Sequence, residues 1–233
     1  MNPRALTVAA LFVERFVLAF IFFCLAWAEF NKVQAFLASQ LGNRVTFVLG
    51  IAYHALLLLV GGCTCLLLLV GRQTIVPPRE LKAIVVPLVA TFLNFFYFSI
   101  QWMPASLQAN LSPPALQTPL AVTGLVCIIV GPLIALWGIL YLGRSFGIFV
   151  AVRGIILKGP YRWVRHPMYQ GWILLYLGLA FANFSAGYLI MVAIHICIVI
   201  YRARLEEAEL AQHSEQYREY MRRTGFLFPK WRG

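Results

Sequence analysis

The chain is poor in charged residues, and poorest in acidic ones. It contains no aspartate, and charged residues make up 12% of its 233 positions, against roughly 25% in an average soluble domain. Lys, Arg, Asp and Glu are all missing between Ala83 and Gly143, and again between His166 and Tyr201. Hydrophobic residues make up 61% of the chain. This composition argues against an ordinary soluble enzyme.

The apolar stretches are long enough to cross a membrane several times. A helix that spans the hydrocarbon core needs about 20 apolar residues. Four runs of this kind predict spanning helices: Leu6–Phe30, Val45–Val70, Ala83–Trp102 and Leu120–Leu142. The expected fold class is therefore all-α, a polytopic membrane helix bundle. Residues 1–142 would hold the four spanning helices, and residues 143–233 a loop, a helical hairpin and a tail, all in one structural domain.

The basic residues predict how the chain is oriented. Nineteen Lys and Arg face eight Glu, giving a net charge of +11, and twelve of the nineteen follow Gly143. Loops rich in Lys and Arg lie on the cytoplasmic side of membranes. This rule places the loops 71–82 and 143–166 and the tail after Tyr201 on that side. The proline-rich, uncharged segment Met103–Pro119 is expected to be a short loop on the other side.

Residues 167–201 connect two segments predicted on the same side, so they must enter the membrane and return. A break at 183–187 would leave arms of about 15 to 17 residues, or roughly 23 to 26 Å of helix each. We therefore predict a hairpin with both ends in the cytoplasm. A basic tail is also typical of nucleic-acid binding, but a polytopic chain without a recognition motif argues against that partner.

Several reactive residues in the apolar segments are expected to have packing roles. All five cysteines fall inside apolar runs, where buried free thiols are the usual form. Cys63 and Cys65 are two positions apart, but no His, Asp or third Cys lies nearby to complete a metal site, so no metal is expected. His54 and His195 are interpreted as hydrogen-bonded packing residues.

Glu14 and Arg15 interrupt the first apolar run. Neighbours in sequence point about 100° apart on a helix, so these two side chains cannot pair face to face. We interpret them as anchors near a helix end, with Arg15 reaching toward the interface. The alternative is a partner for Glu14 elsewhere in the bundle.

Polar residues with specific chemistry gather in two segments that the hairpin brings together. These are Lys158–Gly171 and Arg202–Leu210. Pro167, at the first turn of a helix, leaves N–H groups free to bind an anion or a carboxylate. Arg202 and Glu206 are four positions apart and therefore share one helix face.

Four motifs stand out in and just after these segments: Gly159-Pro160-Tyr161-Arg162, Arg165-His166-Pro167-x-Tyr169-x-Gly171, Arg202-x-x-x-Glu206-Glu207 and Tyr217-x-x-Tyr220. In these motifs the chain resembles the isoprenylcysteine carboxyl methyltransferase and phospholipid methyltransferase family of integral membrane enzymes. Leu142-Gly143-Arg144-Ser145-Phe146 matches the segment that commonly precedes this core, and the resemblance covers about residues 140–229. One departure is His213-Ser214, where many members have Phe-Gly.

The resemblance implies an S-adenosylmethionine-dependent methyltransferase that acts on a lipophilic acceptor at the cytoplasmic side of a membrane. It implies cofactor-binding roles for eight residues: Gly159, Pro160, Tyr161, Arg165, His166, Pro167, Tyr169 and Glu207. It also implies catalytic roles for Arg202 and Glu206, nearer the acceptor. Arg202 would orient an acceptor carboxylate, whereas Glu206 is the candidate base for an amine.

Alternatives stay open at this stage. An NADPH-dependent membrane sterol or steroid reductase has a related helical arrangement, and a transporter or scaffold is a third interpretation. The acceptor can be a prenylcysteine carboxylate, a lipid amine, a small thiol or a quinone-like lipid, and the oligomeric state is open. His166 as a helix cap and Tyr169 as an interfacial aromatic are the residue-level alternatives. Tyr217, Tyr220 and Phe228 are expected to form an amphipathic surface stripe.

Overall fold

The computed structural model describes residues 3–39, 44–72, 74–78, 80–98 and 103–230, which form helices and irregular loops without a β-strand. Four of the described helices are long and apolar enough to cross a membrane: Val8–Ala35, Val48–Val70, Pro114–Ser145 and Ala186–His213. A shorter apolar helix covers Lys82–Leu93. The all-α polytopic membrane bundle is therefore confirmed.

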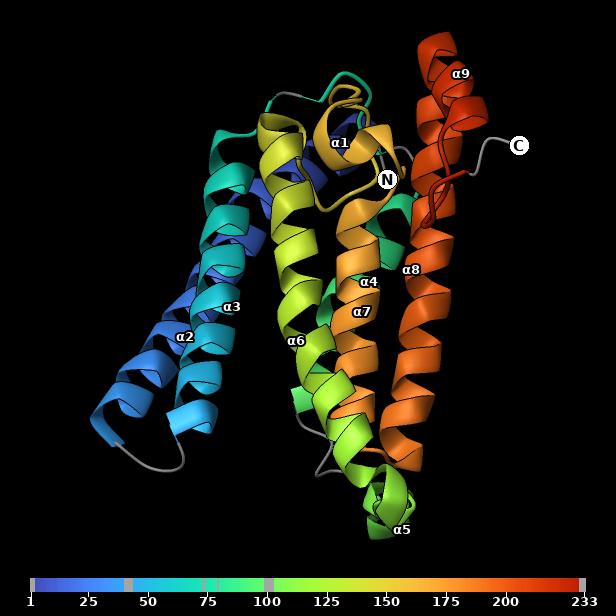
Figure 1. Ribbon diagram of the computed structural model, residues 1–233. Coiled ribbons are helices and arrows are strands. Elements are labelled where there is room, and N and C mark those ends of the chain that lie inside the picture. Colours follow the sequence, from blue (N-terminus) through green and yellow to red (C-terminus); the bar gives the residue numbers. More distant parts are fainter. Residues whose placement is uncertain (1–2, 40–43, 73, 79, 99–102, 231–233) are drawn as a thin grey trace.

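The first membrane helix is a long rod with a π-helical segment in it. It comprises α1 (Pro3–Phe12), the π-helix η1 (Val13–Leu18) and α2 (Ala19–Ser39). The rod continues beyond the predicted end at Phe30, and there Glu29 and Lys32 form an ion pair of 2.6 Å along the helix. α3 (Arg44–Val70) returns beside α2 (Figure 1).

Prolines lie close to the start of each of the next helices. α4 (Lys82–Phe98) contains Pro87, α5 (Ala105–Gln108) is short, and α6 (Pro114–Leu142) has 29 residues. α6 begins before the predicted Leu120 because proline is well suited to the first helical position, where its missing N–H has no partner to lose. The expectation of a loop throughout Met103–Pro119 is therefore wrong in part. Trp102, the predicted end of the third helix, lies outside the described residues.

The last apolar stretch is a helical hairpin, as predicted. α7 (Pro167–Ala182) and α8 (Ala186–His213) are joined by the short turn 183–185, and Ser185 caps α8. α8 continues beyond Tyr201, so the first part of the expected tail is helical. Ser214 then accepts a hydrogen bond from the Tyr217 N–H at 3.2 Å and caps α9 (Glu215–Arg223).

α6 and α7 pack with their backbones in close approach. A Cβ atom on Gly131 would lie 2.6 Å from the Gly171 carbonyl oxygen, and one on Gly124 would lie 2.8 Å from that of Gly178. Small residues permit this approach between membrane helices. The contact fastens the 16-residue α7 to the much longer α6.

The outer surface of the bundle is apolar, as expected for a surface that faces lipid. Large exposed side chains include Phe20, Phe23 and Val122. The five cysteines, all among the described residues, are free; Cys24 and Cys197 are exposed, and the other three are half-buried. The expectation of burial is therefore wrong for Cys24 and Cys197 and met only in part for the others, because an apolar membrane helix presents one face to the lipid.

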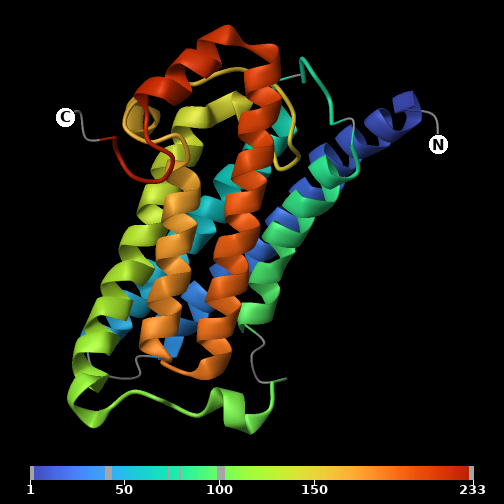
Figure 2. The same cartoon turned by 90° about the vertical axis from the view of Figure 1, so that its right-hand side faces the viewer.

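The two ends of the bundle differ. One end carries α1, the loop that follows α3, the segment 143–166 and α9, whereas the opposite end carries α5 and the turn 183–185 (Figure 1, Figure 2). The basic segments that were predicted to share one side of the membrane therefore share one end of the bundle. The predicted site residues lie at that same end.

Candidate functional site

The candidate site lies at the open end of the hairpin, where the segment 143–166 meets α8. This segment contains only the short helices η3 (Gly143–Ser145) and η4 (Gly159–Arg162). Backbone hydrogen bonds hold it from two sides: Val152 N donates to Val76 O at 3.0 Å, and Arg165 N donates to Gly225 O at 2.8 Å. The segment is thus fastened between the connection that precedes α4 and the C-terminal residues.

Glu207 is the central anion at the hairpin mouth. Its Oε1 lies 2.5 Å from Arg165 Nε and 3.2 Å from His166 Nε2, and its Oε2 lies 3.3 Å from Arg204 Nη1. Arg165 also donates to the Thr224 carbonyl oxygen. Both oxygens of Glu207 are therefore engaged by protein groups, which tie the loop to α8 and to the C-terminal residues.

Arg202 and Glu206 share one helix face, as their spacing predicts, and Tyr169 joins them from α7. Glu206 Oε1 lies 3.2 Å from Arg202 Nε and accepts a hydrogen bond from the Tyr169 hydroxyl. Arg202 Nη2 donates to the Ile148 carbonyl oxygen at 2.7 Å. Arg202 is only 6% exposed. Among the described residues, Arg202 Nη1 and Glu206 Oε2 have no hydrogen-bond partner, so each keeps a group available to a substrate.

Aromatic rings form one wall of the site. The rings of His166 and Tyr169 are stacked, with centroids 5.4 Å apart and planes 9° apart. Phe226 meets His166 edge-on at 5.0 Å. The Arg202 guanidinium lies 5.2 Å from the centroid of the Tyr169 ring. Such faces can stack on a flat ring or lie beside a cation.

Three hollows surround Tyr169. Two of them, of about 90 and 100 Å³, adjoin at the loop side and share Gly154, Met168, Tyr169 and Glu206 as lining residues. The third, of about 100 Å³, lies among the membrane helices and is lined by Met168, Tyr169 and Arg202. Tyr169 and Met168 therefore stand between the loop-side hollows and a hollow inside the bundle.

Two tyrosines expected on the surface are instead part of the site. Tyr217 is 4% exposed, whereas Phe228 is 75% exposed and is the one of the three that matches the expected surface stripe. The Tyr220 hydroxyl donates to the Tyr161 carbonyl oxygen at 2.5 Å. Burial raises the pKa of the Tyr161, Tyr217 and Tyr220 hydroxyls above the ordinary value. The expectation fails because α9 lies against the loop rather than on a membrane surface.

The predicted site residues fall into three groups. Five line the loop-side hollows: Tyr161, Arg165, His166, Tyr169 and Glu206. Arg202 lines the hollow inside the bundle. Gly159, Pro160, Pro167 and Glu207 line none of these hollows. Gly159 has a positive φ of 60° and lies against the ring of Tyr141, so a side chain would not fit there.

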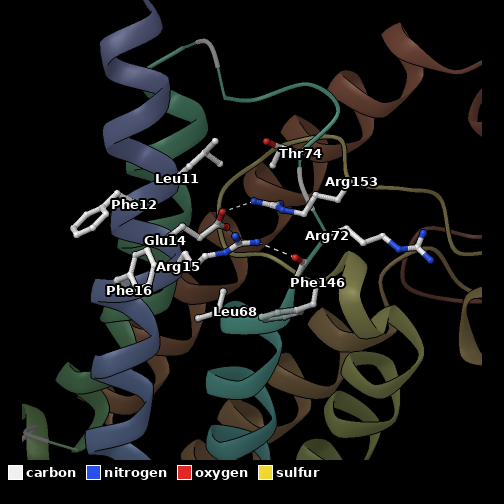
Figure 3. A pocket seen from close by; sticks show the side chains of 11 residues that line it. Leu11, Phe12, Glu14, Arg15, Phe16, Leu68, Arg72, Thr74, Phe146 and Arg153 are labelled. Atoms are coloured by element: carbon white, nitrogen blue, oxygen red, sulfur yellow. Dashed lines mark hydrogen bonds and ion pairs between the residues drawn. The ribbon is translucent and has the colours of Figure 1, made fainter.

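Glu14 is a residue whose place the sequence did not predict. It is 6% exposed, and its Oε1 accepts hydrogen bonds from the N–H groups of Ile148 at 2.6 Å and Phe149 at 2.8 Å. It also forms an ion pair with the buried Arg153 (Figure 3). The interpretation as a helix-end anchor is therefore wrong for Glu14. An acid inside an apolar run was a signal for a buried partner, but it did not identify that partner.

The other polar residues of the apolar helices contact neighbouring groups. Arg15 Nη2 donates to the Gly71 carbonyl oxygen at 2.9 Å, beside a hollow of about 420 Å³ (Figure 3). His54 Nδ1 lies 2.7 Å from Glu29 Oε2, which confirms a hydrogen-bonded packing role. His195 is buried at the interface of α7 and α8.

Comparison with known proteins agrees with the motifs. Residues 120–217 match the family model described as phospholipid methyltransferase. Among curated proteins, none matches the chain at a significant level. The matched range includes most of α6, the hairpin and all ten predicted site residues, from Gly159 to Glu207, whereas Glu14 lies outside it.

Proposed function

We propose that the protein is an integral membrane methyltransferase of the phospholipid methyltransferase family, whose model residues 120–217 match, and that it transfers a methyl group from S-adenosylmethionine to a lipophilic acceptor. The observation that supports this best is that Tyr169 lines both the loop-side hollows and the hollow inside the bundle, and that its hydrogen bond to Glu206, which pairs with Arg202, connects the two sides. A polar cofactor from the aqueous side and an acceptor from the membrane would meet there.

The residues around the loop-side hollows fit S-adenosylmethionine in chemical character. Tyr161, His166, Tyr169 and Tyr217 offer aromatic faces to an adenine ring and to a positive sulfonium. Glu206 offers a free oxygen to hydroxyl or amino donors. When bound, the cofactor would supply a methyl group that the positive sulfur has already activated for transfer.

Glu207 would act on the cofactor through other residues. Its two oxygens hold Arg165, His166 and Arg204, and His166 in turn stacks on Tyr169. Fixing these rings before the cofactor binds reduces the cost of ordering them. Glu207 is therefore proposed as a support for the cofactor site rather than as a direct ligand.

Cofactor binding would require part of the wall to move. The loop-side hollows, of about 90 and 100 Å³, are smaller than the roughly 300–1,000 Å³ of pockets for drug-sized ligands. Residues 154–156 line one of them, and among the described residues no backbone hydrogen bond ties the segment 154–157 to another segment. We expect this segment to move outward when the cofactor enters.

Arg202 and Glu206 suit different acceptors. Arg202 Nη1 is free to orient a carboxylate, and Glu206 Oε2 is free to take the proton that an amine must lose. In either case these two residues would hold the acceptor so that its electron pair points at the methyl group that the cofactor would supply. Because Arg202 is buried, water is excluded from the place where the methyl group would be transferred, and the guanidinium keeps one orientation.

Thermal unfolding in detergent tests the proposed cofactor. S-adenosylhomocysteine should raise the Tm, since a ligand at 100 times its Kd adds about 2.7 kcal/mol to the free energy of unfolding. NADPH should leave the Tm unchanged. Transfer of a labelled methyl group to a prenylcysteine, amino lipid, thiol or quinone would then identify the acceptor. Stabilisation by NADPH and not by S-adenosylhomocysteine would overturn the proposal in favour of a reductase.

A further inference from the structure

Glu14 reaches from the first membrane helix to the segment that holds Arg202. The Phe149 N–H donates to Glu14 Oε1 at 2.8 Å, and the Ile148 carbonyl oxygen accepts from Arg202 Nη2 at 2.7 Å. The Phe149 N–H and the Ile148 carbonyl belong to the same peptide group. One peptide therefore connects the Glu14 carboxylate to the Arg202 guanidinium.

The negative charge of Glu14 lies at the N–H end of this peptide and the positive charge of Arg202 at its carbonyl end, which is the favourable orientation for the peptide dipole. A carboxylate at the N–H end polarises the amide and makes its carbonyl oxygen a better acceptor for a cation. The Ile148 N–H also donates to Glu14 Oε1, at 2.6 Å, so that two consecutive N–H groups are held by one oxygen. Glu14 and Arg202 are each 6% exposed, so water does not weaken these contacts.

Arg153 completes the arrangement. It pairs with Glu14 and donates to the Phe149 carbonyl oxygen at 3.1 Å. Figure 3 shows Glu14 and Arg153 pointing toward each other from the first helix and the loop. Arg153 thus balances the charge of Glu14, while Glu14 Oε1 accepts hydrogen bonds from the two N–H groups of the loop. Glu14 also lies in the π-helix η1, and such segments are frequent at functional sites.

We propose that Glu14 is a positioning residue for Arg202: it holds the Ile148–Phe149 peptide in the one orientation that fixes the guanidinium at the acceptor side of the site. This inference rests on the proposed function, since it assigns Glu14 to methyl transfer. Arg165 and His166, at the loop-side hollow of about 90 Å³, are held by Glu207 and the C-terminal residues, so Glu14 should affect turnover more than cofactor affinity.

A pair of double variants isolates the peptide contact. Glu14→Gln with Arg153→Met removes both buried charges and keeps an oxygen that can accept the two N–H bonds. Glu14→Leu with Arg153→Met removes the charges and the oxygen as well. The first should retain kcat within about fivefold of wild type, whereas the second should lose about 100-fold, the cost of a misplaced catalytic group. The affinity for S-adenosylhomocysteine should change less than about threefold in both.

Glu29→Gln is the matched control, because Glu29 is a second glutamate of the same rod, bonded to His54 and Lys32 away from the site. It should keep the wild-type kcat. Equal kcat values for the two double variants would overturn the inference. So would a loss of cofactor affinity as large as the loss of kcat, because that pattern indicates a general collapse of the site.

A double-mutant cycle tests the contact without any activity. In the Arg153→Met background, the changes in Tm caused by Glu14→Leu and by Arg202→Gln should not add, because the two side chains share one peptide. Additive changes would overturn the inference. If the wild-type protein binds no S-adenosylmethionine, the proposed function fails, but the cycle still decides whether Glu14 and Arg202 are coupled.

Discussion

Glu14 and Arg202, from the first and the last membrane helices, hydrogen-bond to opposite ends of the peptide group that joins Ile148 and Phe149. The loop that contains this peptide lies outside both helices, yet it connects them. Glu14 lies outside the range 120–217 that matches the family, whereas Arg202 lies inside it.

The basic end of the bundle should face the cytoplasm. Lys and Arg are concentrated in the segments at this end, and the positive-inside rule assigns them to that side. Cysteines introduced by Lys158→Cys and His213→Cys should react with a membrane-impermeant reagent from the cytoplasmic face of sealed vesicles. Gln108→Cys, in α5 at the opposite end, should react from the other face. Labelling of positions 158 and 213 from different faces would disprove the orientation and the hairpin.

His166→Ala should weaken S-adenosylmethionine binding by roughly 10-fold or more while the protein stays folded. The ring lines a loop-side hollow, stacks on Tyr169 and contacts Glu207, and a hydrogen bond to a charged group contributes about 1.5–3 kcal/mol. Isothermal calorimetry measures the change. His54→Ala, remote from the site, is the control and should bind the cofactor normally. Unchanged affinity in His166→Ala would remove this residue from the cofactor site.

Arg202→Ala should lower turnover far more than it lowers cofactor affinity. The guanidinium lines the hollow inside the bundle and has Nη1 free for an acceptor. A loss of about 2–4 kcal/mol of transition-state stabilisation is expected in kcat/KM. Arg202→Lys should recover only part of the activity, because lysine restores the charge without the planar fork. Wild-type rates in Arg202→Ala with every acceptor would show that the residue only supports the fold.

The protein should lose stability in alkaline solution through its buried tyrosines. Burial raises the pKa of the Tyr217 hydroxyl above its ordinary value of about 10. The fold favours the neutral phenol, so its contribution to the free energy of unfolding is complete below a pH of about 10 and is lost as the pH rises through the folded-state pKa. The Tm of Tyr217→Phe should therefore fall less steeply than that of wild type above about pH 10. Parallel Tm curves for the two proteins would contradict this.

The sequence by itself determined the features that depend on local pattern. Long uncharged runs predicted the membrane helices, the distribution of Lys and Arg predicted the hairpin, and the spacing of Arg202 and Glu206 predicted their shared face. These predictions succeed because helix periodicity and the length needed to cross a bilayer are properties of one continuous stretch of sequence. The motifs around His166 also indicated the family that residues 120–217 match.

Only the tertiary structure decided which polar groups meet across the bundle. Glu14 contacts Ile148 and Arg153, and Tyr217 is buried rather than on a surface. These contacts join residues far apart in the chain, and their partners depend on how helices and loops pack in three dimensions. A buried carboxylate is stable only with hydrogen-bond donors and a positive charge beside it. The sequence shows that Glu14 needs such partners, but it does not identify them. The position of the loop 143–166 between the first helix and α8 determines which groups Glu14 contacts.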